Sequence, residues 1–519
     1  MPICAFYGIF AKSEPLFQTV AVSFCPGYVA QASWLCVQIL STKHLAKPKR
    51  MRKFAWLKPK SINRQYLLNN NYFMSNHPTH RSPITWVPTA YFAMGMPFVV
   101  LNMVTVLMFK GMGVDDKLIT FWTSLILLPW TLKPLWSPFL SLWKTKKFFV
   151  IATQLISGIT FGLVAVALQL PHFFSISIAL LAVIAFSGAT HDIACDGVYM
   201  GELSTSDQAK YIGWQGAFYN IAKIFATGGL VYLAGWLIEY YSSQQGNSAF
   251  VANRDAWMMI MALLGGVMVL LGVYHIFMLP SSEKSHSAAG RTFKDIMNEL
   301  ATVLSDFFKK RHIVYYICFI LLYRFAEGFV MKIVPLFLKA DRAMGGLGLT
   351  EKEIGLYYGT YGAAAFVLGS LLAGYYISAK GLQKTLFTLC CIFNLPFLVY
   401  AFLAFFQPES GLLICSGIVF EYFGYGFGFV GLTLFMMQQI APGKYQMAHY
   451  AFASGIMNLG VMIPGMMSGW VCETLGDLFN RPGGYEPFFI FVLIATIPAF
   501  IITWFVPFNY KKDGTPIEC

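Results

Sequence analysis

Charged residues are scarce in this sequence. Asp, Glu, Lys and Arg make up 12% of its 519 residues, whereas a typical soluble domain carries roughly 25%. Hydrophobic residues make up 57% and aromatic residues 17%. A chain of this length with so few charges cannot cover its surface with polar groups. The composition therefore excludes an ordinary soluble enzyme and predicts an all-α protein embedded in lipid.

Several motifs of catalysis and cofactor binding are also missing. The ten cysteines are scattered, without a C-x-x-C pair and without histidines at metal-ligand spacing. No G-x-x-x-x-G-K-[ST] loop is present, so this chain does not power its work with ATP. We therefore expect no disulfide framework, no metal site and no cofactor.

What the sequence does contain is a series of long apolar runs separated by polar breaks. Each run is long enough to cross a hydrocarbon core about 30 Å thick. We predict twelve transmembrane helices, near residues 86–109, 118–140, 147–170, 173–194, 209–238, 255–279, 313–338, 350–378, 385–406, 411–440, 446–473 and 486–508.

The net charge of +13 follows the same pattern, because lysines and arginines gather in short segments beside the apolar runs. Such a bias is typical of cytoplasmic loops and places both termini in the cytoplasm. These lysines and arginines do not form an extended basic face. We therefore expect the lipid bilayer as a partner and no nucleic acid. The lysines that set this orientation are Lys144, Lys146, Lys147, Lys380, Lys384, Lys511 and Lys512.

The N-terminal residues 1–83 differ from the rest of the chain. Their one apolar stretch, near residues 20–40, is short and polar for a span, and it precedes a basic block. We interpret this segment either as a disordered extension or as sequence upstream of a true translation start at Met74.

The longest internal break covers residues 280–312 and divides the expected spans six and six. Its second half is amphipathic at helical spacing, which favours a helix lying on the cytoplasmic membrane surface. We therefore divide the chain into the extension 1–83, a six-helix bundle 84–280, a linker 281–312, a second six-helix bundle 313–510 and a cytoplasmic tail 511–519. This plan resembles the major facilitator superfamily, whose members bind a solute between two halves and rock around it.

Two motifs extend the resemblance to one branch of that superfamily. Residues 187–197 (SGATHDIACDG) are similar to the Q-D-I-x-x-D segment of AmpG-type muropeptide permeases and related acetyl-CoA transporters. Residues 128–138 (LPWTLKPLWSP) are similar to the L-P-Y-x-x-K-x-L-W-[AS]-P segment of the same branch. The resemblance covers about residues 84–510 and implies transport of a small solute by alternating access.

The chain also departs from the superfamily at its gate. The loop signature G-x-x-x-D-x-x-G-R-K usually carries an aspartate that helps to close the cytoplasmic side. Ser378 replaces this aspartate after the eighth expected span, and Ser141 stands at the corresponding place after the second. We therefore expect another set of charges to serve as the gate.

Lys133, Asp192 and Asp196 are the candidates for this gate. Asp192 and Asp196 are spaced i,i+4 and share one helix face, and Lys133 lies at a similar depth in the second expected span. The cluster either closes the gate or forms a static ion pair that orients helices. Asp192 and its neighbour His191 are also candidates to carry a proton.

Further ionisable residues lie near the middle of the expected spans, where an unpaired charge costs several kcal/mol and marks a functional candidate. Arg324 and Glu327, spaced i,i+3, either neutralise each other or act as a solute anchor and a proton-coupling group. Glu421 is either a coupling carboxylate or a structural group. We assign Lys223 to solute binding and expect Lys332 to extend toward the membrane surface.

Uncharged polar residues complete the predicted solute site. Asn102, Gln215 and Asn220 lie within apolar spans, where amides suit the recognition of a sugar. Trp122, Trp130 and Trp214 are either rings that stack on a pyranose or members of the usual interfacial aromatic belts.

The sequence therefore predicts a secondary transporter and not an enzyme. We expect a monomer in a bacterial inner membrane that couples a proton to the symport of a saccharide or muropeptide-like solute. An acyl-CoA or another organic anion is the alternative cargo. A membrane-embedded transferase is a remote alternative, since the loops contain no catalytic cluster.

Overall fold

The computed structural model describes residues 81–203, 205–245, 248–280 and 293–509. Three segments discussed above lie mainly or wholly outside these residues: the extension up to residue 80, the first part of the linker and the tail 511–519. The described residues form helices and connecting turns, without a strand. This agrees with the all-α class expected from the composition.

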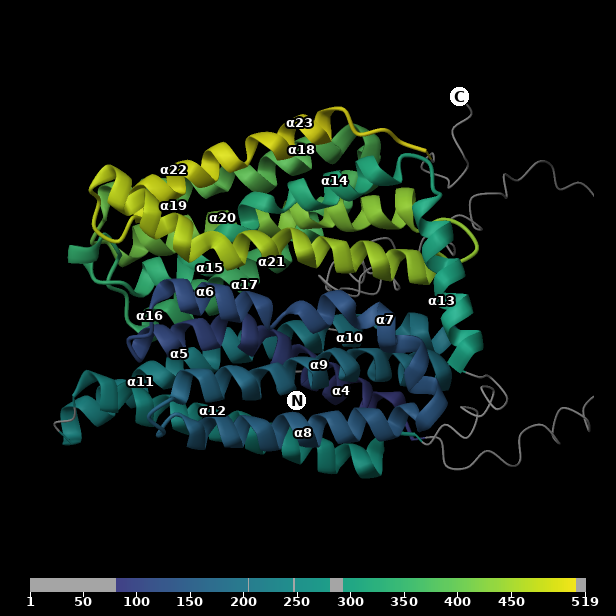
Figure 1. The fold of residues 1–519 in the computed structure, drawn as a ribbon, viewed down its shortest axis with the longest axis horizontal. Coiled ribbons are helices and arrows are strands. Elements are labelled where there is room, and N and C mark those ends of the chain that lie inside the picture. The colour runs from purple at the N-terminus through teal and green to yellow at the C-terminus, as the bar shows by residue number, and fades with distance from the viewer. Residues whose placement is uncertain (1–80, 204, 246–247, 281–292, 510–519) are drawn as a thin grey trace, which may run out of the picture.

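The N-terminal half, residues 81–280, is built from α4 (Val87–Val99), α5 (Thr105–Gly111), α6 (Asp116–Leu125), α7 (Leu128–Trp143), α8 (Lys146–Ala167), α9 (Phe173–Glu202), α10 (Thr205–Ile224), α11 (Val231–Gln245) and α12 (Ala249–Met278). The C-terminal half, residues 313–509, contains α14 (Ile313–Tyr323), α15 (Phe325–Lys339), α16 (Glu351–Ile354), α17 (Ala363–Lys380), α18 (Leu382–Asn394), α19 (Leu398–Phe406), α20 (Gly411–Phe435), α21 (Gln446–Phe479), α22 (Tyr485–Ala495) and α23 (Ile497–Trp504). In Figure 1 the two halves lie one above the other, with their helices roughly parallel.

Eleven helical segments within the described residues are long and apolar enough to cross a membrane. The seventh span that we expected, 313–338, is instead two helices, α14 and α15, which break at Arg324. The backbone of Arg324 has φ −105° and ψ 5°, outside the helical region. Discontinuous helices of this kind are typical of solute sites in transporters.

Helix α13 (Phe293–Phe308) crosses one end of both halves, at the right of Figure 1. It packs against α7 of the N-terminal half and against α14 and α21 of the C-terminal half. The ring of Phe307 is buried against Phe452 of α21. We call this end of the molecule the linker side, and the opposite end, with the loops around residues 112–115 and 340–350, the far side.

Within the described part of the chain, four stretches change from α-helical to π-helical hydrogen bonding: Val100–Val104, Phe225–Leu230, Gly355–Gly362 and Met436–Ile440. Such segments are rare and are frequent at functional sites. The second and third of these segments pack against each other across the two halves. Glycines make this approach possible, because a Cβ atom on Gly355 would lie 2.7 Å from the backbone nitrogen of Tyr232.

Candidate functional site

The ion pair of Arg324 and Glu327 lies in the interior of the C-terminal half. The guanidinium group donates through Nε and Nη2 to the two carboxylate oxygens of Glu327. Both side chains are buried, and Tyr425 on α20 interacts electrostatically with each of them. This bidentate geometry is among the strongest that a charged pair can form.

The helix break explains why this pair forms here. Arg324 occupies the residue between α14 and α15, and Glu327 lies in the first turn of α15. The first turn of a helix has unpaired N–H groups and a positive end of the helix dipole, which together stabilise a carboxylate. The break therefore places Glu327 where its negative charge is stabilised, with Arg324 within reach.

Glu421 lies on α20, and its carboxylate accepts a hydrogen bond of 2.9 Å from the hydroxyl group of Tyr400 on α19. It is 5% exposed. Nearby glycines let α20 approach its neighbours, since a Cβ atom on Gly424 would lie 2.5 Å from the carbonyl oxygen of Ile392 on α18. Glu421 is therefore hydrogen-bonded in this state, and both of its expected roles stay predictions.

Lys223 of the N-terminal half lies beside these residues of the C-terminal half. It stands at the end of α10, yet its ammonium nitrogen lies 4.6 Å from the ring centre of Phe366 and 5.9 Å from that of Tyr422, both in the C-terminal half. It interacts electrostatically with Glu421 and Glu327 but forms none of the ion pairs among the described residues. A half-buried ammonium group that rests on aromatic faces is able to accept an anionic partner.

The structure thus brings four of the predicted residues together: Lys223, Arg324, Glu327 and Glu421. Around them lie aromatic side chains from α17, α19, α20 and the π-helical segment before α17. These rings belong to Tyr358, Phe366, Tyr400, Tyr422, Tyr425 and Phe429. We call this set of ten residues the central cluster.

Lys133 and Asp192 meet toward the linker side of the N-terminal half. The ammonium nitrogen of Lys133 lies 3.4 Å from Oδ2 of Asp192, which also accepts a 3.0 Å hydrogen bond from the indole N–H of Trp130. Asp196 instead accepts a hydrogen bond of 2.9 Å from Tyr91 on α4. The indole of Trp130 is thus engaged with a carboxylate, which weakens its assignment as a platform for a sugar.

His191 is part of a buried hydrogen-bonded chain. Its Nε2 lies 2.9 Å from Nε2 of Gln154, and Oε1 of Gln154 lies 2.8 Å from Nδ1 of His275. The other ring nitrogen of His275 lies 2.9 Å from the hydroxyl oxygen of Thr89. The chain therefore links α9, α8, α12 and α4 inside the N-terminal half.

Among the predicted amides, Asn102 contacts the other half through Lys332. Asn220 donates to the carbonyl oxygen of Gly216, one turn earlier on α10. Gln215 is buried on the same helix. Asn102 accepts a hydrogen bond from Lys332 on α15.

The side chain of Lys332 does not lie where the sequence analysis predicted it. We expected its side chain to extend toward the membrane surface, but it is 1% exposed and its ammonium group is enclosed by oxygens of the N-terminal half. Two of these three oxygens are backbone carbonyls, which no residue pattern could have indicated. Only the cost of placing a lysine within a span pointed to it.

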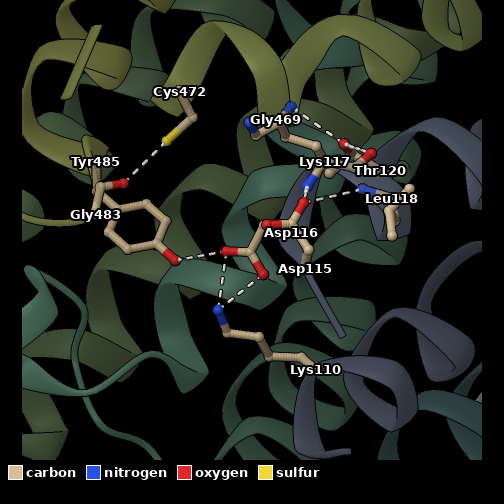
Figure 2. Close-up of polar contacts among 10 residues, drawn as sticks. All are labelled: Lys110, Asp115, Asp116, Lys117, Leu118, Thr120, Gly469, Cys472, Gly483 and Tyr485. Atoms are coloured by element: carbon tan, nitrogen blue, oxygen red, sulfur yellow. Dashed lines mark hydrogen bonds and ion pairs between the residues drawn. The ribbon is translucent and has the colours of Figure 1, made fainter. Parts of the chain in front are cut away.

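The far side is closed by polar contacts between the halves. Asp116 accepts hydrogen bonds from Lys110 of its own half and, at 3.2 Å, from Tyr485 of α22 (Figure 2). The backbone N–H of Gly469 on α21 donates to the hydroxyl of Thr120 at 3.2 Å. An ion pair joins Lys117 to Glu473, so α6 is held against α21 and α22.

The fold agrees with a comparison of the sequence with known families. The profile of the Major Facilitator Superfamily matches residues 89–467, which is most of the described chain. The chain belongs to the major facilitator superfamily. It is a multi-pass membrane protein, and the members of this superfamily that it resembles are transporters.

Within the superfamily the chain resembles AmpG-type proteins. It is 23% identical over 425 residues to AmpG 4 of Rickettsia conorii, named as a transporter, covering 79% of this chain and 93% of that protein. It is 22% identical over 420 residues to the anhydromuropeptide permease of Escherichia coli K12, covering 79% and 77%. The AmpG-like resemblance that the two sequence motifs indicated is therefore confirmed.

Solved structures of major facilitator transporters share the fold. A D-xylose-proton symporter matches with a TM-score of 0.61 at 12% identity, covering 82% of this chain and 97% of that one. The nucleoside transporter NupG matches with a TM-score of 0.60 at 13% identity, covering 82% and 99%. At such identities the agreement concerns the fold alone.

Proposed function

We propose that this transporter moves a saccharide-containing or muropeptide-like solute by proton-coupled symport, with alternating access around the central cluster. It would act as a monomer in a bacterial inner membrane with both termini in the cytoplasm. The observation that carries the proposal is the position of Lys223. This cation belongs to the N-terminal half but rests on aromatic rings of the C-terminal half.

The position of Lys223 supports a solute with an anionic group. Its ammonium group takes part in none of the ion pairs among the described residues, although Glu421 and Glu327 act on it electrostatically, so a solute carboxylate bound there would provide a direct counter-charge. The rings of Tyr422 and Phe366 beside it offer faces on which a sugar ring can stack. A solute that contacts both Lys223 and these rings bridges the two halves, as alternating access requires.

Within this proposal the coupling proton binds to the carboxylate of Glu327. When Glu327 accepts a proton, its attraction for Arg324 falls, and the guanidinium group becomes available to the solute. When the proton leaves, Glu327 recaptures Arg324 and displaces the solute. Proton and solute binding would then favour each other, which is the requirement for symport.

An acyl-CoA or another organic anion is the second candidate cargo, because Lys223 favours any anionic group. The aromatic lining favours the saccharide class, since a pyranose ring offers a flat C–H face to it. The related permease of E. coli is named for an anhydromuropeptide, which combines sugars with carboxylates.

Uptake into proteoliposomes tests the proposal. The purified chain is reconstituted and given a radiolabelled anhydromuropeptide, a neutral saccharide or an acyl-CoA, with and without an imposed pH gradient. We expect gradient-dependent accumulation of the anhydromuropeptide, recovered chemically unchanged. Preferred uptake of the acyl-CoA would favour the second candidate, chemical conversion of the solute would favour a transferase, and no accumulation of any of the three under a gradient would discard the proposal.

A pair of lysine variants locates the solute. Lys223→Met should raise KM for the anhydromuropeptide by about tenfold or more, because a charge-assisted contact is worth about 1.5–3 kcal/mol. The control is Lys384→Met, which removes an exposed lysine outside the central cluster and should leave KM unchanged. Equal effects of the two substitutions would exclude Lys223 from the solute site.

A further inference from the structure

Lys332 is a buried charge whose partners are all neutral oxygens of the opposite half. Its ammonium nitrogen lies 3.1 Å from the carbonyl oxygen of Asn102, 3.1 Å from Oδ1 of Asn102 and 3.3 Å from the carbonyl oxygen of Thr123. An ammonium group has three N–H donors, so these oxygens satisfy all of them. Lys332 takes part in none of the ion pairs among the described residues.

Two irregularities in the helices lie beside the carbonyl groups that contact Lys332. Asn102 lies in a π-helical segment, at whose end the N–H of Thr105 bonds with the carbonyl of Val100, five residues earlier. Near the end of α6, the N–H of Leu127 bonds with Ser124 and not with Thr123, its usual α-helical partner. The second irregularity leaves the Thr123 carbonyl without that helical donor, and both segments direct a carbonyl oxygen toward Lys332.

Helix α21 covers this arrangement. A Cβ atom on Gly465 would lie 3.3 Å from Cγ of Lys332 and 2.7 Å from the hydroxyl oxygen of Ser124, so α21 packs directly over both. The hydroxyl group of Ser124 is fully buried and has no hydrogen-bond partner among the described residues. The ammonium group is therefore enclosed between the halves, with an additional buried oxygen nearby.

The far-side contacts keep the enclosure shut. Thr120 bonds with Gly469 about one turn before Thr123 on α6, and Asp116 bonds with Tyr485 at the start of the same helix. If α6 and the first span move away from α15 and α21, Lys332 loses all three oxygens together. Its charge is then exposed to water.

We propose that Asn102 and Thr123 form an internal cation site, which holds the Lys332 ammonium group while the far side is closed and sets the balance between the far-side-closed and far-side-open states. In the closed state the charge is dehydrated, and only the three oxygens replace its water. In the open state water replaces the oxygens. Any change in the oxygens therefore shifts the balance between the two states.

Substitutions of Asn102 test this proposal in opposite directions. Leucine has a size similar to that of asparagine, but Asn102→Leu removes Oδ1. The dehydrated Lys332 charge then loses an acceptor, so the population of the far-side-open state should increase. Asn102→Asp keeps the shape of the side chain and adds a negative charge beside Lys332, so the population of the far-side-closed state should increase. Because the second variant preserves the side-chain shape, it tests the site even where the first fails to fold.

The measurement is the labelling rate of a reporter, Thr120→Cys, in the full-length purified chain. This position is buried in the far-side interface, so a maleimide reaches it only in the open state. Peptide mass spectrometry separates it from the native cysteines. We expect labelling to become about tenfold faster with Asn102→Leu, the effect of losing one charge-assisted hydrogen bond, and several-fold slower with Asn102→Asp.

The decisive comparison repeats these variants in two backgrounds. With Lys332→Met the charge is gone, so Asn102→Leu should change the labelling rate by less than about twofold if the two residues act as a pair. With Lys339→Met, which removes another lysine of α15 that pairs with Glu351 in its own half, the full effect should persist. An equal effect in the Lys332→Met background, or no effect of either Asn102 variant, would overturn the proposal.

This experiment contains no solute and no pH gradient. Its failure would leave the proposed cargo and coupling untouched, and a chain that transports none of the tested solutes can still show the predicted shifts. The result of the labelling experiment is therefore independent of the result of the uptake experiment.

Discussion

The ammonium nitrogen of Lys133 lies 3.4 Å from Oδ2 of Asp192, and both residues belong to the N-terminal half. A contact within one half cannot by itself hold two halves together. It fixes α7 relative to α9, and α7 packs against α21 of the other half. Any influence of this pair on alternating access must therefore pass through the orientation of α7.

The first prediction concerns this pair. Asp192→Asn should abolish uptake, because it removes the negative charge that faces the Lys133 ammonium group and the indole N–H of Trp130. Exchanging the two residues, Lys133→Asp with Asp192→Lys, should restore uptake only in part, since the indole N–H of Trp130 cannot donate to an ammonium group. Initial uptake rates in proteoliposomes measure both effects. Full activity of the Asp192→Asn and Lys133→Ala single variants would remove the pair from the mechanism.

The second prediction separates stability from transport at Arg324 and Glu327. Glu327→Gln should lower the free energy of unfolding by up to about 3–5 kcal/mol, because it leaves a buried guanidinium group without a counter-ion. The double variant Arg324→Met/Glu327→Leu should recover most of that stability but not uptake. Thermal unfolding and uptake assays measure the two quantities.

A matched control is the pair of Arg254 and Asp255, whose side chains are 30% and 29% exposed. Arg254→Met should change the free energy of unfolding by less than about 1 kcal/mol. Transport at the wild-type rate by the Arg324→Met/Glu327→Leu double variant would show that the buried pair is a static structural element.

The third prediction concerns the close packing of the two central π-helical segments. Gly355→Ala would place a methyl group 2.7 Å from the nitrogen of Tyr232 and 2.9 Å from the carbonyl oxygen of Gly228. Backbone atoms cannot move aside cheaply, so we expect a loss of about 1–3 kcal/mol in the free energy of unfolding. Gly229→Ala is the control, since its nearest neighbour would be 3.8 Å away. Equal thermal midpoints for the two variants would contradict the packing argument.

The fourth prediction uses Lys310, which lies between α13 and α14, outside the membrane-spanning segments. Its ammonium group donates to the carbonyl oxygens of Ile440 and Pro442, and burial lowers its pKa from 10.5 to about 8, although the Asp306 carboxylate acts in the opposite direction. Between these two pKa values the unfolded chain binds more protons than the folded chain. Stability should therefore rise as the pH increases through this window.

The difference in thermal midpoint between the wild type and Lys310→Met isolates this effect from other titrating groups. That difference should increase in favour of the wild type from about pH 8 to about pH 10.5. A difference that stays constant over this window would show that the pKa of Lys310 is the same in the folded and unfolded chains.

Hydropathy was sufficient to predict most of the fold, because a membrane span needs a long apolar run whatever its neighbours are. It could not predict the break at Arg324. The apolar runs on both sides of this residue satisfy the hydropathy criterion whether or not the helix is continuous, and the side chain of Arg324 makes its contacts with residues of α15 and α20. Tertiary contacts of this kind leave no periodic signal.

The candidate site was predicted in part for a similar reason. The cost of a charge in lipid identified Lys223, Arg324, Glu327 and Glu421 one by one, but their meeting in one cluster depends on the packing of the two halves. The oxygens around Lys332 were beyond prediction, since two of the three are backbone carbonyls, which every residue carries and no sequence pattern marks.

The buried chain from Thr89 through His275 and Gln154 to His191 has a consequence for conduction. An amide has a donor end and an acceptor end, and the structure places one imidazole at each. Protons hop along groups that can accept at one atom and release at the same or a conjugate atom, whereas a neutral amide holds its protons. Gln154 therefore separates His191 from His275 as a group that does not relay protons. The hydrogen bonds of this chain are continuous, but protons do not pass along it from one histidine to the other.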